Sequence, residues 1–263
     1  MGLERAIRSA ALAAALSAAL VSAACDAPFN LLFARASDTW TRSYPLTAGG
    51  DVAITNANGP IDIRGGDADK VEIRADRTVR ASTDREAKRT LAGLKMTEDV
   101  GPSQIRIDAA AGLPSGVSVE IAYHVTVPKG AAVDLIVSNG AVSVTGLNGT
   151  VRVRTTNGQI TGRRLAGGVT ADTTNGAIHM AFSQVGSGAI TLHTVNGAID
   201  VSLPPASKVD VSAHCNNGSV SVSGLPMERD VEAPRRLEGR LNGGGTRVAL
   251  RTVNGGIQVS AGS

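Results

Sequence analysis

Hydrophobic and polar residues alternate along most of the chain after residue 40, and Asn-Gly dipeptides interrupt the alternation at regular intervals. The dipeptides that interrupt the alternation in this way begin at Asn58, Asn139, Asn148, Asn157, Asn175, Asn196, Asn217 and Asn254. From Asn139 onward they are spaced by 9, 9, 18, 21, 21 and 37 residues, a unit of about ten that is doubled to 18–21. The alternation predicts short strands with one inward face. Asn and Gly both tolerate positive φ, so we expect each dipeptide to form a sharp corner between two strands.

Alignment on these asparagines places residues of one class at matching positions every 18–21 residues. Two residues before the asparagine stand Thr155, Thr173, Thr194, Cys215 and Thr252. Stacked coils explain this regularity, because like positions then lie above one another and bury a continuous core. The predicted fold class is therefore all-β, a β-solenoid or β-helix-like repeat. A β-sandwich or roll built from Asn-Gly hairpins is the alternative, since Asn-Gly also favours two-residue turns.

The N-terminal half carries a weaker copy of the pattern around Asn58 and one short helix. The helix is predicted over Asp84–Met96, with Thr83 or Asp84 as its cap. Residues 226–246 break the repeat, and we expect them to form a loop or cap over the last coils, because a solenoid must shield its open ends. The repeat domain is predicted to span residues 40–261, with its main Asn-Gly array over 131–261.

Residues 1–24 have the features of a secretory signal peptide, with two arginines before an Ala/Leu run and small residues at its end. The apolar run is shorter than the ~20 residues that a transmembrane helix needs, so we expect it to be removed. Cys25 follows in a context that resembles the lipobox of bacterial lipoproteins, which predicts lipidation of Cys25. Ser22 stands where a lipobox usually has leucine, and ordinary cleavage with soluble export is the alternative. Residues 25–39 are expected to form a tether.

Several passages together resemble one known family. They are the recurrent Asn-Gly followed by Ile/Val-x-Val, the passage VPKGAAVDLIVSNGAVSVTGLNGTVRV, the intervening helix and the closing GGGTRVALRTVNGGIQVS. These features resemble the bacterial putative-adhesin β-strand-repeat family of exported domains of unknown function. The resemblance covers roughly residues 40–261. It implies a β-helix-like exported module, and it supplies no catalytic residues to carry over.

The composition narrows the possible functions. The chain has only one Trp, two Tyr and three Phe in 263 residues, too few aromatic faces for a sugar or nucleic-acid reader built on stacking. Its net charge of +3 is too balanced to indicate a nucleic-acid partner. Two cysteines exclude a disulfide-rich scaffold and an all-Cys zinc site.

Four histidine, aspartate and cysteine positions are candidates for chemistry. His193 and His214 both lie three residues before their asparagine, and we expect them to project outward on neighbouring coils about 5 Å apart. With Asp172 at the matching position they could hold a transition metal, although a solvated polar face is the favoured interpretation. Cys215 beside His214 has the residue types of a nucleophile and its base. Its place in the inward threonine series predicts a buried structural side chain instead.

Arginine supplies the remaining candidate site. Arg152, Arg154, Arg163 and Arg164 are expected to cluster on adjoining strands. Guanidinium groups bind phosphate and carboxylate through paired hydrogen bonds, which makes these residues candidates for binding lipid head groups or an acidic polysaccharide.

The sequence as a whole predicts an exported structural or binding module of the cell envelope, adhesin-like, without catalytic activity or cofactor. We expect a lipoprotein that faces the periplasm or the cell surface. Its expected partner is an envelope protein, an envelope polymer or a second copy of the chain, and no nucleic acid. A β-helix polysaccharide hydrolase or lyase is the rival, but it needs paired carboxylates, and the outward acids are isolated at the repeat offsets.

Overall fold

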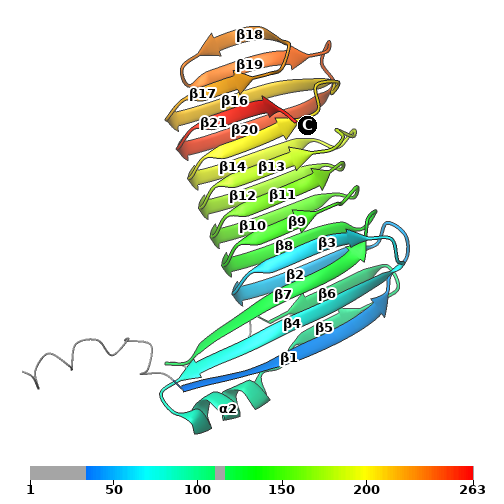
Figure 1. Ribbon diagram of the computed structural model, residues 1–263, viewed down its shortest axis with the longest axis vertical. Coiled ribbons are helices and arrows are strands. Elements are labelled where there is room, and N and C mark those ends of the chain that lie inside the picture. Colours follow the sequence, from blue (N-terminus) through cyan, green and yellow to red (C-terminus); the bar gives the residue numbers. More distant parts are fainter. Residues whose placement is uncertain (1–33, 110–115, 263) are drawn as a thin grey trace, which may run out of the picture.

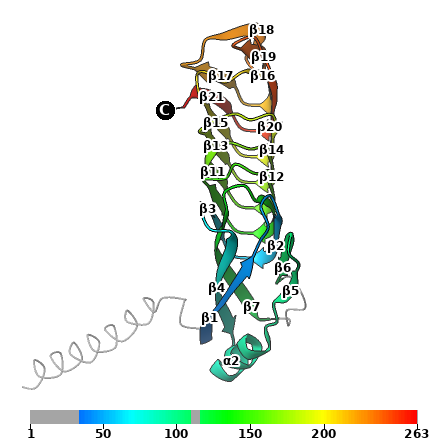
Figure 2. The same ribbon diagram turned by 90° about the vertical axis from the view of Figure 1, so that its right-hand side faces the viewer.

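The protein is a flattened column of two facing β-sheets, one with ten strands and one with eleven. The structure, a computed structural model, describes residues 34–109 and 116–262. Each coil of the repeat contributes one strand to each sheet, and strands of successive coils pair in parallel (Figures 1 and 2). The predicted β-solenoid is confirmed. The predicted signal peptide and Cys25 lie outside the described residues.

Hydrogen-bonded neighbours within each sheet follow an order that differs from the order of the chain. From one edge to the other, the ten-stranded sheet contains β1 (Ala34–Pro45), β4 (Lys70–Ala81), β7 (Ser118–Pro128), β3 (Ile61–Gly66), β9 (Val142–Thr145), β11 (Ile160–Leu165), β13 (Ile178–Phe182), β15 (Ile199–Leu203), β21 (Ile257–Ala261) and β17 (Val220–Ser223). The eleven-stranded sheet contains β18 (Met227–Ala233), β19 (Arg236–Leu241), β16 (Val209–Asn217), β20 (Thr246–Asn254), β14 (Ile190–Asn196), β12 (Val169–Asn175), β10 (Val151–Asn157), β8 (Ala132–Asn139), β2 (Asp51–Asn58), β6 (Gln104–Asp108) and β5 (Thr97–Val100).

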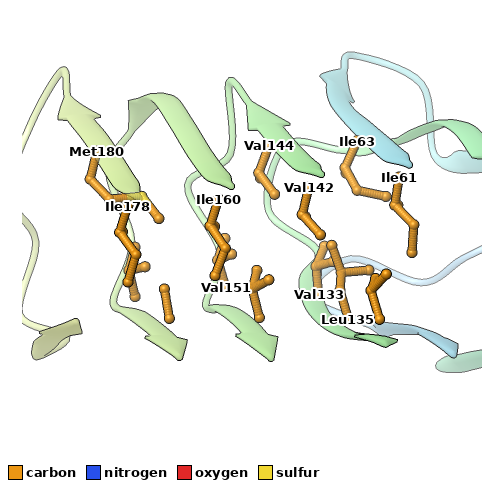
Figure 3. Packing of buried hydrophobic residues seen from close by; sticks show 14 of the residues in the cluster. Ile61, Ile63, Val133, Leu135, Val142, Val144, Val151, Ile160, Ile178 and Met180 are labelled. Carbon is orange, nitrogen blue, oxygen red and sulfur yellow. The ribbon is translucent and has the colours of Figure 1, made fainter. Parts of the chain in front are cut away.

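The core is a stack of aliphatic side chains between the sheets. Every second residue of a strand points inward, and the parallel register places like residues above one another. Val142 pairs with Ile61 on one side and Ile160 on the other, and Ile160 pairs with Ile178 (Figure 3). All four are at most 1% exposed. The space between two sheets of one coil suits branched aliphatic side chains, which explains the scarcity of aromatic residues after residue 45.

An uninterrupted ladder of asparagine side chains runs along one corner of the column. Each Nδ2 donates to the Oδ1 of the neighbouring asparagine at 2.8–2.9 Å. In spatial order the members are Asn58, Asn139, Asn157, Asn175, Asn196, Asn254 and Asn217. Asn148 is not a member, because it lies between β9 and β10 at the opposite corner, where its backbone N–H donates to the carbonyl of Lys129. The half-repeat of nine residues is therefore one strand and one corner.

The glycine that follows each ladder asparagine is required by the distance between coils. A Cβ on Gly158, Gly176 or Gly197 would lie 2.0 Å from the carbonyl oxygen of the matching glycine in the preceding coil. None of these three glycines has a positive φ in the left-handed range, and neither do the ladder asparagines. Our expectation of positive φ was therefore wrong for these three corners, whereas Gly59, Gly218 and Gly255 at other corners have φ of +117°, +153° and +151°. Close stacking selects the glycine, and side-chain hydrogen bonding selects the asparagine.

The inward threonines form hydrogen bonds between coils at the same corner. The hydroxyls of Thr173, Thr194 and Thr252 donate to the carbonyls of Gly158, Gly176 and Gly197 at 3.2, 2.9 and 2.9 Å. Cys215, at the matching position, is 1% exposed and fills the same kind of place without that bond. The predicted inward series is confirmed.

The last coil does not stand at the end of the column. β20 lies between β14 and β16, and β21 lies between β15 and β17, so the C-terminal coil is inserted between two coils that precede it in the sequence. The coils of His193 and His214, which we expected to be neighbours, are therefore separated by the inserted coil. Residues 226–246 make the insertion possible. They form the antiparallel hairpin β18–β19, which pairs with the end strand β16 and lets the chain return (Figure 1).

The N-terminal end of the column differs from the prediction in two boundaries. Helix α2 (Asp84–Gly93) is capped by Thr83, whose Oγ1 accepts the backbone N–H of Glu86, and it ends three residues before Met96. Within residues 34–109 and 116–262, no helix has both the length and the apolar character needed to span a bilayer. The boundary expected at residue 40 falls inside β1. Residues 34–39 pair with β4, so this part of the expected tether belongs to the sheet.

We predict that Gly176→Ala lowers the free energy of unfolding by about 1–3 kcal/mol, because the new methyl group overlaps a backbone oxygen that cannot move without parting two coils. Gly130→Ala is the matched control, since a Cβ there meets no atom within 4 Å. Urea unfolding of both variants checks the prediction. Equal stability of the two variants would contradict the stacking argument.

Candidate functional surfaces

A row of polar side chains crosses the outer face of the ten-stranded sheet. One residue from each strand contributes, and all ten are polar and at least partly exposed. In spatial order they are Thr41, Arg74, His124, Asp62, Ser143, Thr161, His179, Asp200, Gln258 and Ser221. Strand spacing sets these side chains about 4.8 Å apart. The face therefore presents a fixed linear array of hydrogen-bonding groups.

This face is hollowed where the row carries its charges. Three adjoining hollows follow one another across the sheet from β1 to β15. The first and second share Asp62 and Arg64, and the second and third share Thr161 and Arg163. We call this continuous depression the polar groove. Hydroxyl, guanidinium, carboxylate and imidazole groups line it together with a few aliphatic side chains, and no Phe, Tyr or Trp is among the lining residues.

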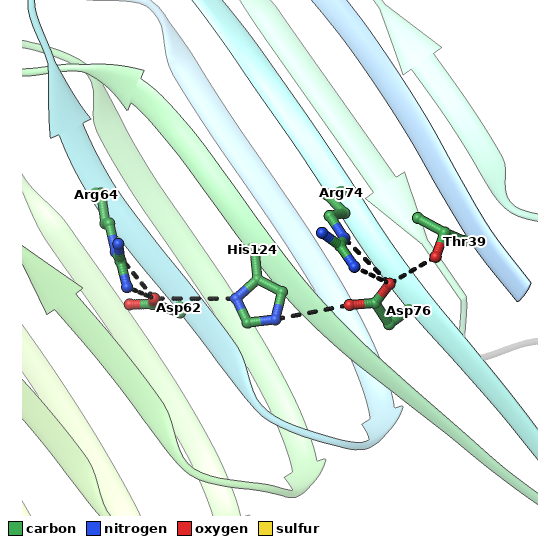
Figure 4. Close-up of polar contacts among 6 residues, drawn as sticks. All are labelled: Thr39, Asp62, Arg64, Arg74, Asp76 and His124. Carbon is green, nitrogen blue, oxygen red and sulfur yellow. Dashed lines mark hydrogen bonds and ion pairs between the residues drawn. The ribbon is translucent and has the colours of Figure 1, made fainter.

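His124 lies at the centre of a charged cluster in the groove (Figure 4). Its Nδ1 is 4.0 Å from Asp62 Oδ2, and its Nε2 is 3.9 Å from Asp76 Oδ2. Arg64 pairs with Asp62 at 2.8 Å, and Arg74 pairs with Asp76 at 3.1 Å. The cluster is held by β3, β4 and β7, where the antiparallel β4 meets the first parallel strands. An Arg–Asp ion pair therefore lies on either side of the imidazole.

The Asp76 carboxyl of this cluster accepts hydrogen bonds from two neighbouring residues. The Thr39 hydroxyl donates to its Oδ1 at 2.7 Å, and Arg74 adds two longer bonds. These donors stabilise the ionised form, so the pKa of Asp76 lies below its ordinary value. Thr39 stands on β1, so the ionised carboxylate also links the edge strand to β4.

The four candidate arginines do not form one cluster. Arg152 and Arg154 stand on β10 in the eleven-stranded sheet, whereas Arg163 and Arg164 stand on β11 in the ten-stranded sheet. The two pairs therefore face opposite sides of the column, and the expectation of a single cluster was wrong. Arg163 and Arg164 line the polar groove.

A bulge explains why two consecutive arginines both reach the groove. The pairing of β11 with β13 shifts between Arg163 and Leu165, and Arg164 has a φ of +51°. Both arginine side chains are exposed, whereas neighbours on a regular strand point to opposite faces. Neither makes an ion pair with another residue of the described ranges 34–109 and 116–262.

The expected pairing of His193 with His214 is also wrong. Arg251 of the inserted strand β20 lies between them, paired with His193 on one side and His214 on the other. His193 instead has Asp172 as its neighbour, with 3.7 Å between Nδ1 and Oδ1. Throughout the part of the chain that the structure describes, no three His, Cys, Asp or Glu side chains are grouped to hold a metal ion.

His179 and His214 do not form a catalytic or metal site either. His179 and Asp200 occupy matching positions on β13 and β15, and their side chains are 2.7 Å apart at about two-fifths exposure. Cys215 points into the core while His214 is exposed, so the two side chains lie on opposite faces of β16. They cannot act as nucleophile and base.

Sequence reasoning missed the His124 cluster entirely. Its members come from strands far apart in the chain and lie outside the Asn-Gly array that set the alignment. The available signal was the charged residue at every second position of KVEIRADRTV and IDIR, which marks outward faces. That signal does not tell which strands become neighbours.

The fold and the repeat define a family. The model of the family described as Toastrack DUF4097 matches residues 51–260, and the chain belongs to this family. The predicted resemblance to adhesin-like domains of unknown function is thereby confirmed. The family's description names no enzymatic activity. No curated protein matches the chain.

The chain is similar to solved structures from several bacteria. A putative cell adhesion protein from Clostridium sporogenes is 12% identical with a TM-score of 0.47, over 86% of this chain and 100% of that one. A putative adhesin from Bacteroides fragilis is 11% identical with a TM-score of 0.35, over 85% and 97%. A putative lipid binding protein from Parabacteroides distasonis is 10% identical with a TM-score of 0.29, over 86% and 97%.

We predict that Asp76 contributes stability that is lost in acid. Because its folded-state pKa is lowered, the contribution is present above the ordinary aspartate value of about 4 and disappears as the pH falls through the folded-state pKa. The stability difference between wild type and Asp76→Asn should therefore shrink below about pH 4. Urea unfolding at a series of pH values checks this.

Thr39→Val is the companion variant, because it removes the hydrogen bond that lowers the pKa most. The stability difference between Thr39→Val and Asp76→Asn should change less with falling pH than the difference between wild type and Asp76→Asn. An unchanged acid dependence in Thr39→Val would contradict the assigned cause.

Proposed function

We propose that this protein is an exported, lipid-anchored module of the cell envelope that binds its partner through the polar groove and does not catalyse a reaction. The observation that carries the proposal is the polar row across all ten strands of one sheet. Side chains on stacked coils keep fixed spacing, so a surface of this kind suits recognition of an extended polar partner.

The anchoring part of the proposal rests on the sequence around Cys25. Lipidation there would place the acyl chains a short distance before β1, which begins at Ala34. The groove begins at the same end of the column, since Thr41 and Ser43 of β1 line its first hollow. An anchored chain would therefore hold the charged end of the groove nearest the membrane, and the array would extend away from it.

Intact mass and cell fractionation test the anchor. Wild type should carry acyl mass on a mature N-terminal Cys25 and sediment with membranes. Cys25→Ser should lose both properties, because the thiol is the acceptor of the lipid. Cys215→Ser is the control, since that cysteine is buried in the core and should leave anchoring unchanged. A wild-type mature chain without acyl mass would refute lipidation.

We further propose that the groove's ligand is anionic, a phosphate- or carboxylate-bearing envelope polymer or lipid. The second hollow brings Arg64, Arg163 and Arg164 together with the hydroxyls of Ser143, Thr145 and Thr161. Arg64 is paired with Asp62, which leaves Arg163 and Arg164 as the cations with unused donors. Guanidinium groups beside hydroxyl donors bind anions by charge-assisted hydrogen bonds.

The double variant Arg163→Gln/Arg164→Gln should weaken anion binding about thirtyfold, since each of the two charge-assisted contacts contributes on the order of 1 kcal/mol at an exposed site. Arg152→Gln/Arg154→Gln removes the same charge from the opposite face and is the matched control. Sedimentation with phosphatidylglycerol vesicles and titration with soluble polygalacturonate distinguish a lipid from a polymer ligand. Equal loss in the two double variants would indicate unspecific charge attraction and contradict the groove.

A further inference from the structure

The two sheets have four end strands, and β1 is the least protected of them. β5 and β17 have four residues each. β18 carries four charged side chains and a shift in register between Arg229 and Val231. Short length, charge and irregularity are the features that keep edge strands from pairing with other chains. β1 instead has twelve residues, pairs with β4 without any shift, and has no strand on its other side in the described structure.

The middle of β1 is open to solvent. Eight of its twelve residues are exposed, and only Ala36 is buried. Helix α2 lies below the N-terminal part of the strand in Figure 1, and toward Pro45 the side chains of Arg42 and Tyr44 contact Glu98 of β5. Its outer backbone N–H and C=O groups form a row of hydrogen-bonding sites without a partner strand in the described structure.

The sequence of this edge is complementary to itself. Ser37-Asp38-Thr39-Trp40-Thr41-Arg42-Ser43 reads as a chemical palindrome around Trp40. If two copies pair antiparallel about a two-fold axis at Trp40, Asp38 of each lies opposite Arg42 of the other. Serine then lies opposite serine, threonine opposite threonine and tryptophan opposite tryptophan. A register moved by two residues would set Trp40 opposite Asp38 or Arg42 and would lose both charge pairs.

We propose that two copies of this chain associate edge to edge through β1, with the two-fold axis at Trp40. Opposite charges and aromatic pairs directly across antiparallel strands favour one register, and a two-fold contact of identical strands closes as a dimer. The exposed edge supplies the backbone hydrogen bonds. Asp38 and Arg42 each keep about two-fifths of the side chain exposed, beside their contacts with Arg77 and Glu98. An interface made of one strand from each copy buries little surface, so its affinity is low and the dimer forms at high local concentration.

Sedimentation equilibrium of the full chain over a range of concentrations tests self-association, without any anionic ligand present. Its outcome is therefore independent of the groove proposal. Wild type should show a monomer–dimer equilibrium. A wild type that stays monomeric at all concentrations overturns the proposal.

Charge exchange tests the register. Asp38→Arg or Arg42→Asp alone puts like charges opposite each other twice, and should weaken the dimer about tenfold. The double variant Asp38→Arg/Arg42→Asp should restore it, because opposite charges face again. Within one chain the double variant should be less stable than either single variant. It places an arginine beside Arg77 and an aspartate beside Glu98, and both are pairs of like charge. An intramolecular role for the two residues therefore predicts no rescue.

Glu120→Arg is the control for charge reversal inside the sheet, and it should leave the dimer unchanged. Circular dichroism verifies folding of each variant. Failure of the double variant to recover dimerisation while folded overturns the register.

Cysteine cross-linking gives a second readout of the axis. Trp40→Cys places one cysteine on the axis, and the double variant Thr39→Cys/Thr41→Cys places cysteines on either side of it. One of these two sets lies at a non-hydrogen-bonded pair and should form a disulfide-linked dimer on oxidation, whereas Thr41→Cys alone should not. A folded protein in which neither set gives a linked dimer also counts against the axis.

Discussion

The close stacking of one coil on the next at the Asn-Gly corner is the constraint on which the rest of the structure depends. The corner glycines approach so closely that a Cβ would lie within 2.0–2.2 Å of the carbonyl below. That approach brings neighbouring asparagine amides to 2.8–2.9 Å and lets the inward threonines reach the same carbonyls. Once this corner is fixed, strand register is fixed, and with it the face on which every side chain lies.

The outer faces acquire their character from that register. Inward positions are filled by branched aliphatic residues, whereas outward positions are free to vary, and the chain fills them with hydroxyls and charges. On the ten-stranded sheet this produces a groove rather than a scatter of polar residues, because matching positions on successive coils lie side by side. A bulge at Arg164 adds a second arginine where a regular strand would allow one. The proposed anion site follows from a local departure from the repeat.

The N-terminal end of the column breaks the repeat in a different way. Antiparallel strands β1, β4 and β7 replace parallel coils there, and they create both the charged cluster around His124 and the long free edge of β1. The opposite end is closed by the β18–β19 hairpin, with charged residues and a bulge on its outer strand. The two ends therefore differ in their capacity for strand pairing, which gives the column a direction.

The sequence by itself determined the all-β solenoid, the coil length, the inward series with Cys215, the cap of the helix and the family, because each depends on local alternation or on recurrence at fixed spacing. It did not determine which strands become neighbours. The insertion of β20 separated His193 from His214, and the assignment of strands to two sheets separated Arg152 and Arg154 from Arg163 and Arg164. Coils with the same corner and the same inward residues are interchangeable in local energy. Only tertiary structure, through the returning hairpin and the packing of whole strands, decides the order in which they stack and the sites that this order creates.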